Sequence, residues 1–114
     1  MRAEDRIRLL HMTEAAQAAL KFVAGKQKAD LQSDQMLLFA VVRAIEILGE
    51  AANKVSEDLQ SANSSIPWRA MVGMRNRLVH AYFDVDTEMV WKTLQSEIPE
   101  LLSTLQALLL SDQA

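Results

Sequence analysis

The stretch 34–59, DQMLLFAVVRAIEILGEAANKVSEDL, decides the fold of this chain. Its apolar residues recur every three or four positions, the period of one face of an α-helix. Ser33 or Asp34 is placed to cap the start of that helix. The pattern predicts a helix to about Leu59. Its apolar face comprises Leu37, Val41, Ala44, Ile45, Leu48, Ala52 and Val55, widened by Phe39 and Val42.

The other side of this helix carries a polar stripe of Arg43, Glu46, Glu50 and Asn53, at i, i+3, i+7 and i+10. Residues at such spacings are neighbours on a helix surface. The stripe is either a solvated face with an Arg43–Glu46 ion pair or the wall of a groove or subunit seam. Gly49 lies within it, and the missing side chain would let another helix approach closely.

The segments on either side are also helical in pattern. A first helix is expected from about Glu4 to Val23, ended by Gly25, with a polar loop after it. We expect its apolar stripe to contain Ile7, Leu10, Ala15, Ala18 and Phe22. Because no segment alternates with period two, the predicted class is all-α: a single domain, residues 1–114, forming an antiparallel bundle of four to five helices.

The later helices are shorter. Pro67 is placed at the start of a third helix that ends near Tyr82. Asp84 or Asp86 would cap a fourth. Pro99 either breaks or kinks that helix or begins a fifth one, whose apolar face is leucine-rich.

Composition excludes several classes of protein. The chain has no cysteine and only two histidines, so neither a disulfide nor a zinc site is expected. It has no apolar run of the ~20 residues that span a bilayer and no signal peptide, so we expect a cytoplasmic protein that does not enter a membrane. The net charge of −3 argues against a general nucleic-acid coat protein.

One window departs from this acidic balance. Residues 59–83 contain no Asp or Glu but include Arg69, Arg75, Arg77 and His80. This window predicts a basic patch suited to a phosphate-bearing partner, unless the gap in acidic residues arose by chance. Arg77, Arg43 and Glu46 are candidates for lining a cleft beside it.

Within the window lies the sequence MRNRLVHAYF, residues 74–83. On a helix, Asn76 and His80 would share one face, and Arg75 and Tyr82 a neighbouring one. Histidine can move a proton at neutral pH, and arginine offers a fork of donors that matches a phosphate. Together they suit metal-free cleavage of RNA, in which the ribose 2′-OH attacks the adjacent phosphorus. From the residues alone, a structural role for Arg75 and His80 at the helix end is the favoured explanation.

A single histidine is half of such a site, because the reaction needs both a base and an acid. A two-fold dimer would bring two copies of the motif into one cleft. We therefore expect a homodimer on chemical as well as stability grounds.

The motif Arg75-Asn76-x-Leu78-x-His80-x-Tyr82 resembles the R-x4-H-x-Y motif of HepT-like HEPN proteins. The stretches 8–12, 44–52, 66–68 and 98–101 resemble other landmarks of that family, in the same order. The resemblance implies an all-helical homodimer and a metal-independent ribonuclease toxin of a type VII-like toxin–antitoxin pair, with no cofactor. Arg75 and His80 would be catalytic, assisted by Asn76.

The resemblance also implies a partner and a modification. The antitoxin of such a pair is a minimal nucleotidyltransferase that transfers AMP to the motif tyrosine, here Tyr82. The alternative is a non-enzymatic nucleotide-binding or adaptor domain that only docks a nucleotidyltransferase partner, because the basic window would serve it as well.

Overall fold

The structure, a computed structural model of the chain, describes residues 1–81 and 84–113. The elements are α1 (Ala3–Val23), α2 (Lys28–Ser33), α3 (Gln35–Asn53), α4 (Glu57–Ala62), α5 (Trp68–Val72), α6 (Met74–Leu78), β1 (Val79–Ala81), β2 (Asp84–Val85), α7 (Thr87–Lys92), a π-helical segment (Thr93–Glu97) and α8 (Ile98–Gln113). The predicted all-α class is confirmed, with one two-stranded sheet as an addition. In the described part of the chain, no helix has the length and apolar character needed to cross a membrane.

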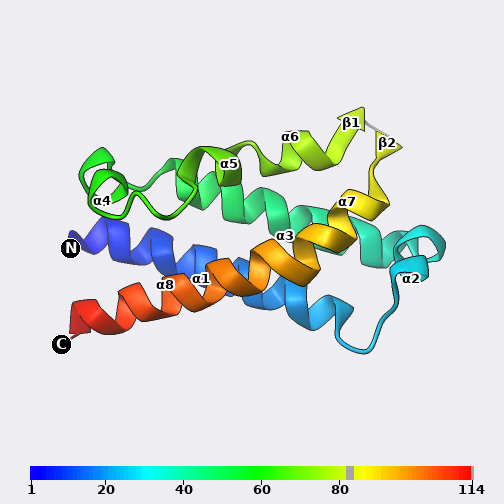
Figure 1. Cartoon of the computed structure of the whole chain (residues 1–114), viewed down its shortest axis with the longest axis horizontal. Helices are drawn as coiled ribbons and strands as arrows, with labels where there is room; N and C mark the ends of the chain where they lie inside the picture. Colours follow the sequence, from blue (N-terminus) through cyan, green and yellow to red (C-terminus); the bar gives the residue numbers. More distant parts are fainter. Residues whose placement is uncertain (82–83, 114) are drawn as a thin grey trace.

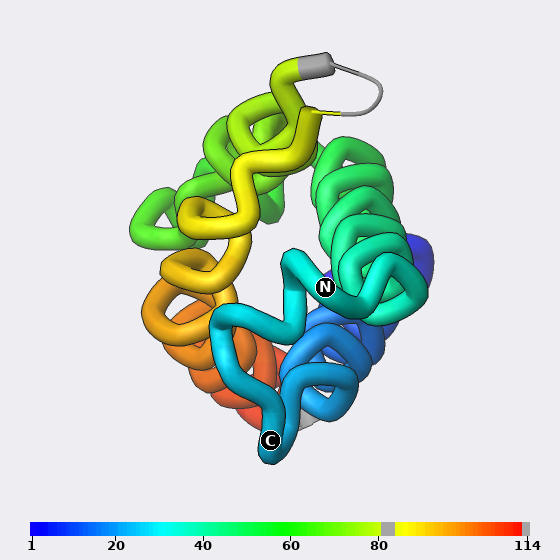
Figure 2. The backbone as a smooth tube through the Cα atoms, turned by 90° about the vertical axis from the view of Figure 1, so that its right-hand side faces the viewer, coloured from blue at the N-terminus to red at the C-terminus, as the bar shows by residue number. Residues whose placement is uncertain are grey.

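The long helices α1 and α3 lie side by side and form the centre of the bundle (Figure 1). Helix α8 packs on α1, and α5 and α6 pack on α3. Helix α7 contacts α6 and α2. The helices therefore form a ring around the core, as the end-on view shows (Figure 2). The two ends of the chain meet at one end of the bundle, where Arg6 Nη1 lies 3.0 Å from Asp112 Oδ2.

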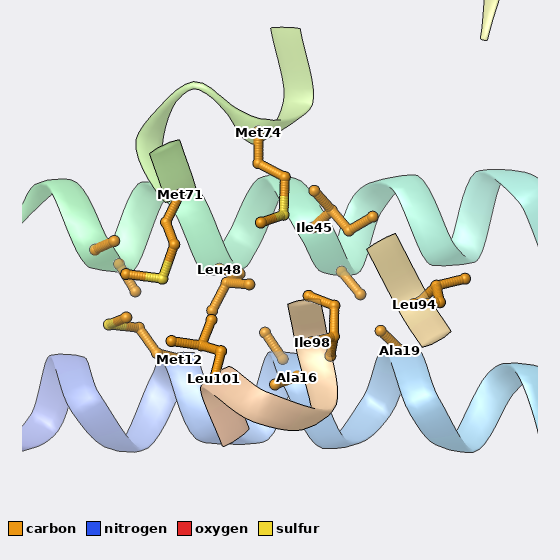
Figure 3. Close-up of a cluster of buried hydrophobic side chains, with 14 of the residues drawn as sticks. Met12, Ala16, Ala19, Ile45, Leu48, Met71, Met74, Leu94, Ile98 and Leu101 are labelled. Atoms are coloured by element: carbon orange, nitrogen blue, oxygen red, sulfur yellow. The ribbon is translucent and has the colours of Figure 1, made fainter. Parts of the chain in front are cut away.

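The space that these helices enclose is filled by aliphatic and thioether side chains. Figure 3 shows Met12 and Ala16 of α1, Leu48 of α3 and Met71 of α5 pointing into the same volume as Ile98. These residues are at most 1% exposed. Burying apolar surface contributes about 25 cal/mol per Å², so this contiguous core is the main stabilising term.

The predicted apolar face of α3 is confirmed, since all seven of its main residues are buried. Asp34 is the N-cap and accepts a hydrogen bond from the Leu37 amide at 3.1 Å. Two details were wrong. Phe39 is 58% exposed, and the helix ends at Asn53, because Ser56 caps a separate helix, α4, by accepting from the Leu59 amide.

The predicted face of α1 was wrong in part. Ile7, Leu10 and Phe22 are exposed, and the buried stripe runs instead through Leu9, Met12, Ala15, Ala16, Ala19 and Val23. Small alanines let α1 and α3 pack closely, so they occupy the buried face in place of the larger residues. The end of α1 is as predicted, because Gly25 has a φ of 75°, which suits glycine.

A short helix replaces the expected polar loop after α1. In α2, Gln27 and Asp30 form a capping box, and the Gln27 amide donates to Asp30 Oδ2 at 2.7 Å. Lys28 of α2 lies 3.3 Å from Glu88 of α7. Helix α2 therefore joins the N-terminal half of the chain to α7.

The predicted third helix, Pro67 to Tyr82, is wrong in its second half. It is interrupted at Gly73, between α5 and α6, and ends at Leu78. The β-branched Val79 has φ −122° and ψ 104°, so the chain becomes extended and pairs with Val85. The Asp86 amide then donates to the Leu78 carbonyl at 2.8 Å, closing the hairpin.

Helix α7, the π-helical segment and α8 follow one another without a loop. Asp86 caps α7 as expected, accepting from the Met89 amide at 3.0 Å. In the π-helical segment the Ile98 amide donates to the Thr93 carbonyl, five residues back. A wider turn just before Pro99 accommodates a residue that lacks an amide hydrogen, so the kink alternative for Pro99 fits the structure.

One buried polar contact holds α1 to the α3–α4 junction. Asp5 is 4% exposed, and its carboxylate accepts from the Ser56 amide at 2.9 Å and from the Ser56 hydroxyl at 2.6 Å. Burial raises the pKa of Asp5, but the hydrogen bonds from Ser56 and the charges of Arg2 and the N-terminal amine lower it by more. The pKa of Asp5 therefore lies below its ordinary value of 3.8.

Candidate active site

The motif residues are divided between a helix and a strand. Arg75 and Asn76 lie on α6, whereas His80 lies on β1, so the predicted sharing of one helical face by Asn76 and His80 is wrong. Helix α6 leads directly into β1 at one end of the molecule (Figure 1). Tyr82, the expected modification site, lies outside the described residues.

Arg75 and Asn76 line a groove of about 210 Å³ between α3 and the α5–α6 segment. We call this the Arg75 groove; its other lining residues are Glu46, Gly49, Glu50, Asn53 and Val72. The polar stripe of α3 therefore forms the wall of a groove, as one of its two interpretations predicted.

Gly49 is the reason that α5 can lie so close to α3. A Cβ atom added at Gly49 would lie 2.9 Å from the Met71 carbonyl oxygen. The predicted close approach of another helix is confirmed. Met71 is followed by Val72, Arg75 and Asn76, which form the side of the Arg75 groove opposite α3. The close contact at Gly49 therefore sets the width of the groove.

Arg75 is held loosely. Its Nε lies 3.9 Å from Glu46 Oε2, and its Nη1 donates to Asn76 Oδ1 at 3.4 Å. The arginine side chain is 46% exposed. Partly exposed ion pairs of this length contribute about 0–1 kcal/mol, so an incoming phosphate can compete with Glu46 for the guanidinium group.

A second ion pair lies along the same stripe of α3. Arg43 Nη1 is 3.4 Å from Glu50 Oε1, seven residues along the helix. The expected Arg43–Glu46 pair is therefore wrong, because Glu46 turns toward Arg75. Arg43, a candidate for lining a cleft, does not line the Arg75 groove, although it pairs with Glu50, which does.

His80 has an acidic neighbour that follows the hairpin. Its Nε2 lies 3.6 Å from Asp86 Oδ2, while Asp86 Oδ1 is held by the Met89 amide. The carboxylate is thus fixed at the start of α7. The imidazole is 55% exposed, so it has an acidic partner on one side and remains open to solvent.

Arg77 points to a different part of the surface. Its Nη2 lies 3.5 Å from Glu97 Oε2 in the π-helical segment, and Arg77 does not line the Arg75 groove. Two arginines and the histidine of the acid-free window thus face carboxylates from outside the window: Arg75 faces Glu46, Arg77 faces Glu97 and His80 faces Asp86. The window is basic in sequence, but folding surrounds it with acidic groups.

Sequence reasoning identified Asp86 only as a helix cap and missed its contact with His80. Two residues that are six positions apart do not lie on the same face of a helix. The contact forms because the pairing of β1 with β2 brings His80 and Asp86 together. The β-branched residues Val79 and Val85 were the feature of the sequence that could have predicted the two strands.

The fold is a helical bundle that carries an arginine and an asparagine on a short helix and a histidine on the strand that follows it. The model of the family "Ribonuclease HepT-like" matches residues 12–108, and the chain belongs to this family.

Curated relatives agree with this assignment. A protein of Thermococcus cleftensis named "Probable ribonuclease HepT" is 46% identical over 63% of this chain and 66% of its own length. Proteins named "Putative RNase" from Caldanaerobacter subterraneus subsp. tengcongensis and Methanocaldococcus jannaschii are 36% and 32% identical over 82% of this chain, and over 83% and 85% of their own lengths. No solved structure is significantly similar to the chain.

Proposed function

We propose that the protein is a metal-independent endoribonuclease, the toxin of a type VII-like toxin–antitoxin pair. The observation that carries this is the match to the HepT-like ribonuclease family together with an exposed His80 whose carboxylate neighbour is fixed. The residues proposed to act are Arg75, Asn76 and His80.

In the proposed reaction the ribose 2′-oxygen forms a bond to the adjacent phosphorus, and the bond to the 5′-oxygen breaks. A base takes the proton of the 2′-hydroxyl, and an acid gives a proton to the leaving 5′-oxygen. His80 serves in one of these roles, and Asp86 orients its ring. Arg75 stabilises the charge on the pentacovalent phosphorus, and Asn76 positions a phosphate oxygen or the guanidinium group.

The second proton-transfer group is proposed to come from a second subunit. Each chain has one histidine in the motif, and His11 lies on α1. A two-fold pairing that faces two copies of His80 would supply both acid and base. The proposed substrate is RNA because the mechanism needs a 2′-hydroxyl group.

Inhibition is proposed to act on the same residues. A minimal nucleotidyltransferase antitoxin would transfer AMP to Tyr82, which follows His80 by two residues. Each added phosphate brings negative charge next to the groups that must bind RNA phosphate. Peptide mass spectrometry after co-expression with a nucleotidyltransferase encoded beside this gene should find AMP-sized mass additions on the peptide containing Tyr82.

The nuclease test uses purified protein, a labelled RNA and EDTA. His80→Ala should abolish cleavage, whereas His11→Ala, a change of the other exposed histidine, should leave it unaltered. Circular dichroism would show that both variants are folded. Cleavage by His80→Ala at the parent rate would refute the proposed mechanism.

A second candidate function rests on the acidic neighbours of Arg75, Arg77 and His80, which weaken attraction for a polyanion. On that view the chain is a non-enzymatic nucleotide-binding domain that docks a nucleotidyltransferase. ATP binding by the isolated protein without RNA cleavage would favour it over the ribonuclease.

A further inference from the structure

A second depression lies at the same end of the molecule as His80 and differs chemically from the Arg75 groove. It has a volume of about 340 Å³ and is lined by residues of α2, the start of α3 and β2. These elements lie toward one end of the molecule (Figure 1). We call it the Phe39 pocket. It is lined by Leu31, Gln32, Ser33, Gln35, Leu38, Phe39 and Val85.

The lining of the Phe39 pocket carries no formal charge. Leu31 is fully buried and Leu38 partly so, which gives an apolar floor, and the Phe39 ring is 58% exposed. The amides of Gln32 and Gln35 lie at the edge, and Gln32 Nε2 donates to Thr87 Oγ1 at 3.3 Å. An open aromatic face beside carboxamides suits a flat, neutral group with hydrogen-bonding edges.

The Phe39 pocket adjoins the proposed catalytic hairpin. Val85 lines the pocket and pairs across the sheet with Val79, which immediately precedes His80. Neighbouring strands lie about 4.8 Å apart, so the pocket borders the short sheet whose other strand carries His80.

We propose that the Phe39 pocket binds the nucleobase next to the scissile phosphate. Phe39 stacks on the base, and the carboxamides of Gln32 and Gln35 contact its edge. The proposal rests on the ribonuclease function proposed above. It divides recognition between two depressions: the Arg75 groove, which has charged walls, takes phosphate, and the uncharged pocket takes a base.

The division gives a role to the Phe39 ring, which is 58% exposed at the start of α3. Stacking between a base and an aromatic side chain contributes about 1–3 kcal/mol, which corresponds to roughly a 5- to 100-fold change in affinity. Every base has a flat face, so the contact is available to any sequence, and the carboxamides supply a preference among bases.

The test measures both cleavage and binding. Phe39→Ala should raise KM for an RNA oligonucleotide about 5- to 100-fold with little change in kcat, and Phe39→Trp should restore the parent KM. Phe22→Ala is the matched control, because Phe22 is also an exposed phenylalanine but lies on α1. Binding of a 2′-O-methyl RNA of the same sequence, followed by fluorescence anisotropy, should weaken by the same factor.

An abasic oligonucleotide localises the contact. Removing the base next to the cleavage site should weaken binding to the parent protein but have little further effect on Phe39→Ala, because both changes remove one interaction. If RNA is cleaved and Phe39→Ala retains the parent KM and affinity, the base pocket is refuted while the ribonuclease stands. If no RNA is cleaved but the 2′-O-methyl RNA binds in a manner that depends on Phe39, the ribonuclease fails and the pocket stands.

A second copy of the chain is the competing occupant, because Met36, next to the pocket, is 80% exposed. Sedimentation of the parent and Phe39→Ala proteins shows whether a nucleobase or a second copy of the chain occupies the Phe39 pocket. An unchanged molecular mass together with weaker RNA binding supports the base pocket. A loss of mass in the variant would assign Phe39 to a subunit contact and overturn the proposal.

Discussion

The contact at Gly49 gives a quantitative prediction. Gly49→Ala would place a Cβ atom 2.9 Å from the Met71 carbonyl oxygen and 3.5 Å from that of Val72. Both atoms belong to the backbone of α5, so no side-chain rotation relieves the contact, and α5 must move. Overpacking costs about 1–3 kcal/mol, and a contact with backbone atoms belongs in the upper part of that range, about 2–3 kcal/mol. The ~1 kcal/mol by which alanine favours a helix over glycine offsets part of this cost.

The expected net loss of stability is about 1–2 kcal/mol. For a chain of 114 residues, an unfolding entropy of about 2.1 cal/mol/K per residue gives ~0.24 kcal/mol/K. The Tm should therefore fall by roughly 4–8 °C in thermal unfolding followed by circular dichroism, at a fixed protein concentration.

Gly73→Ala is the matched control. A Cβ atom there would lie 3.5 Å from the Arg69 carbonyl oxygen, an ordinary contact, and the φ of −86° suits alanine. Its Tm should stay level or rise slightly. Equal Tm values for Gly49→Ala and the parent protein, or an equal loss in both variants, would contradict the close packing of α5 on α3.

Two further predictions concern carboxylates. Because the pKa of Asp5 lies below 3.8, its stabilising effect is present above that pH and is lost as the pH falls through the folded-state pKa. Asp5→Asn, which leaves one Ser56 donor poorly matched, should lose about 1–3 kcal/mol in urea unfolding at pH 7, and progressively less as the pH is lowered below 3.8. A pH-independent loss would show that the charge is not involved. Glu46→Gln removes a negative charge beside Arg75 and should lower KM for RNA about two- to fivefold at low salt. A higher KM in that variant would instead indicate that Glu46 orients Arg75.

Helix α3 was predictable because many residues agree on its buried face. Six apolar positions at helical spacing and the cap at Asp34 all favour the same structure. Helix α1 has a weaker pattern, because its alanines allow more than one stripe. The choice of Ile7, Leu10 and Phe22 followed side-chain size, whereas packing against α3 favoured the small residues.

The site was predictable by residue type but not by geometry. Arg75, Asn76 and His80 stood out as a motif, yet the helix expected to present them ends at Leu78. The prediction continued the helix and underestimated how strongly Val79 and its partner in β2 favour a strand. Glu46 and Glu97, which face Arg75 and Arg77, come from distant parts of the chain, so no local pattern could reveal them.

The π-helical segment Thr93–Glu97 has a consequence for how the chain tolerates changes in length. A π-helical turn holds one residue more than an α-helical turn, so removing one residue from this segment would leave an ordinary α-helical turn with α7 and α8 in nearly the same phase. Val90 would then stay in the core and Asp86 beside His80. A deletion within α7 would instead rotate the residues before it by about 100° relative to α8, so a one-residue deletion should be far better tolerated in the π-helical segment than in α7.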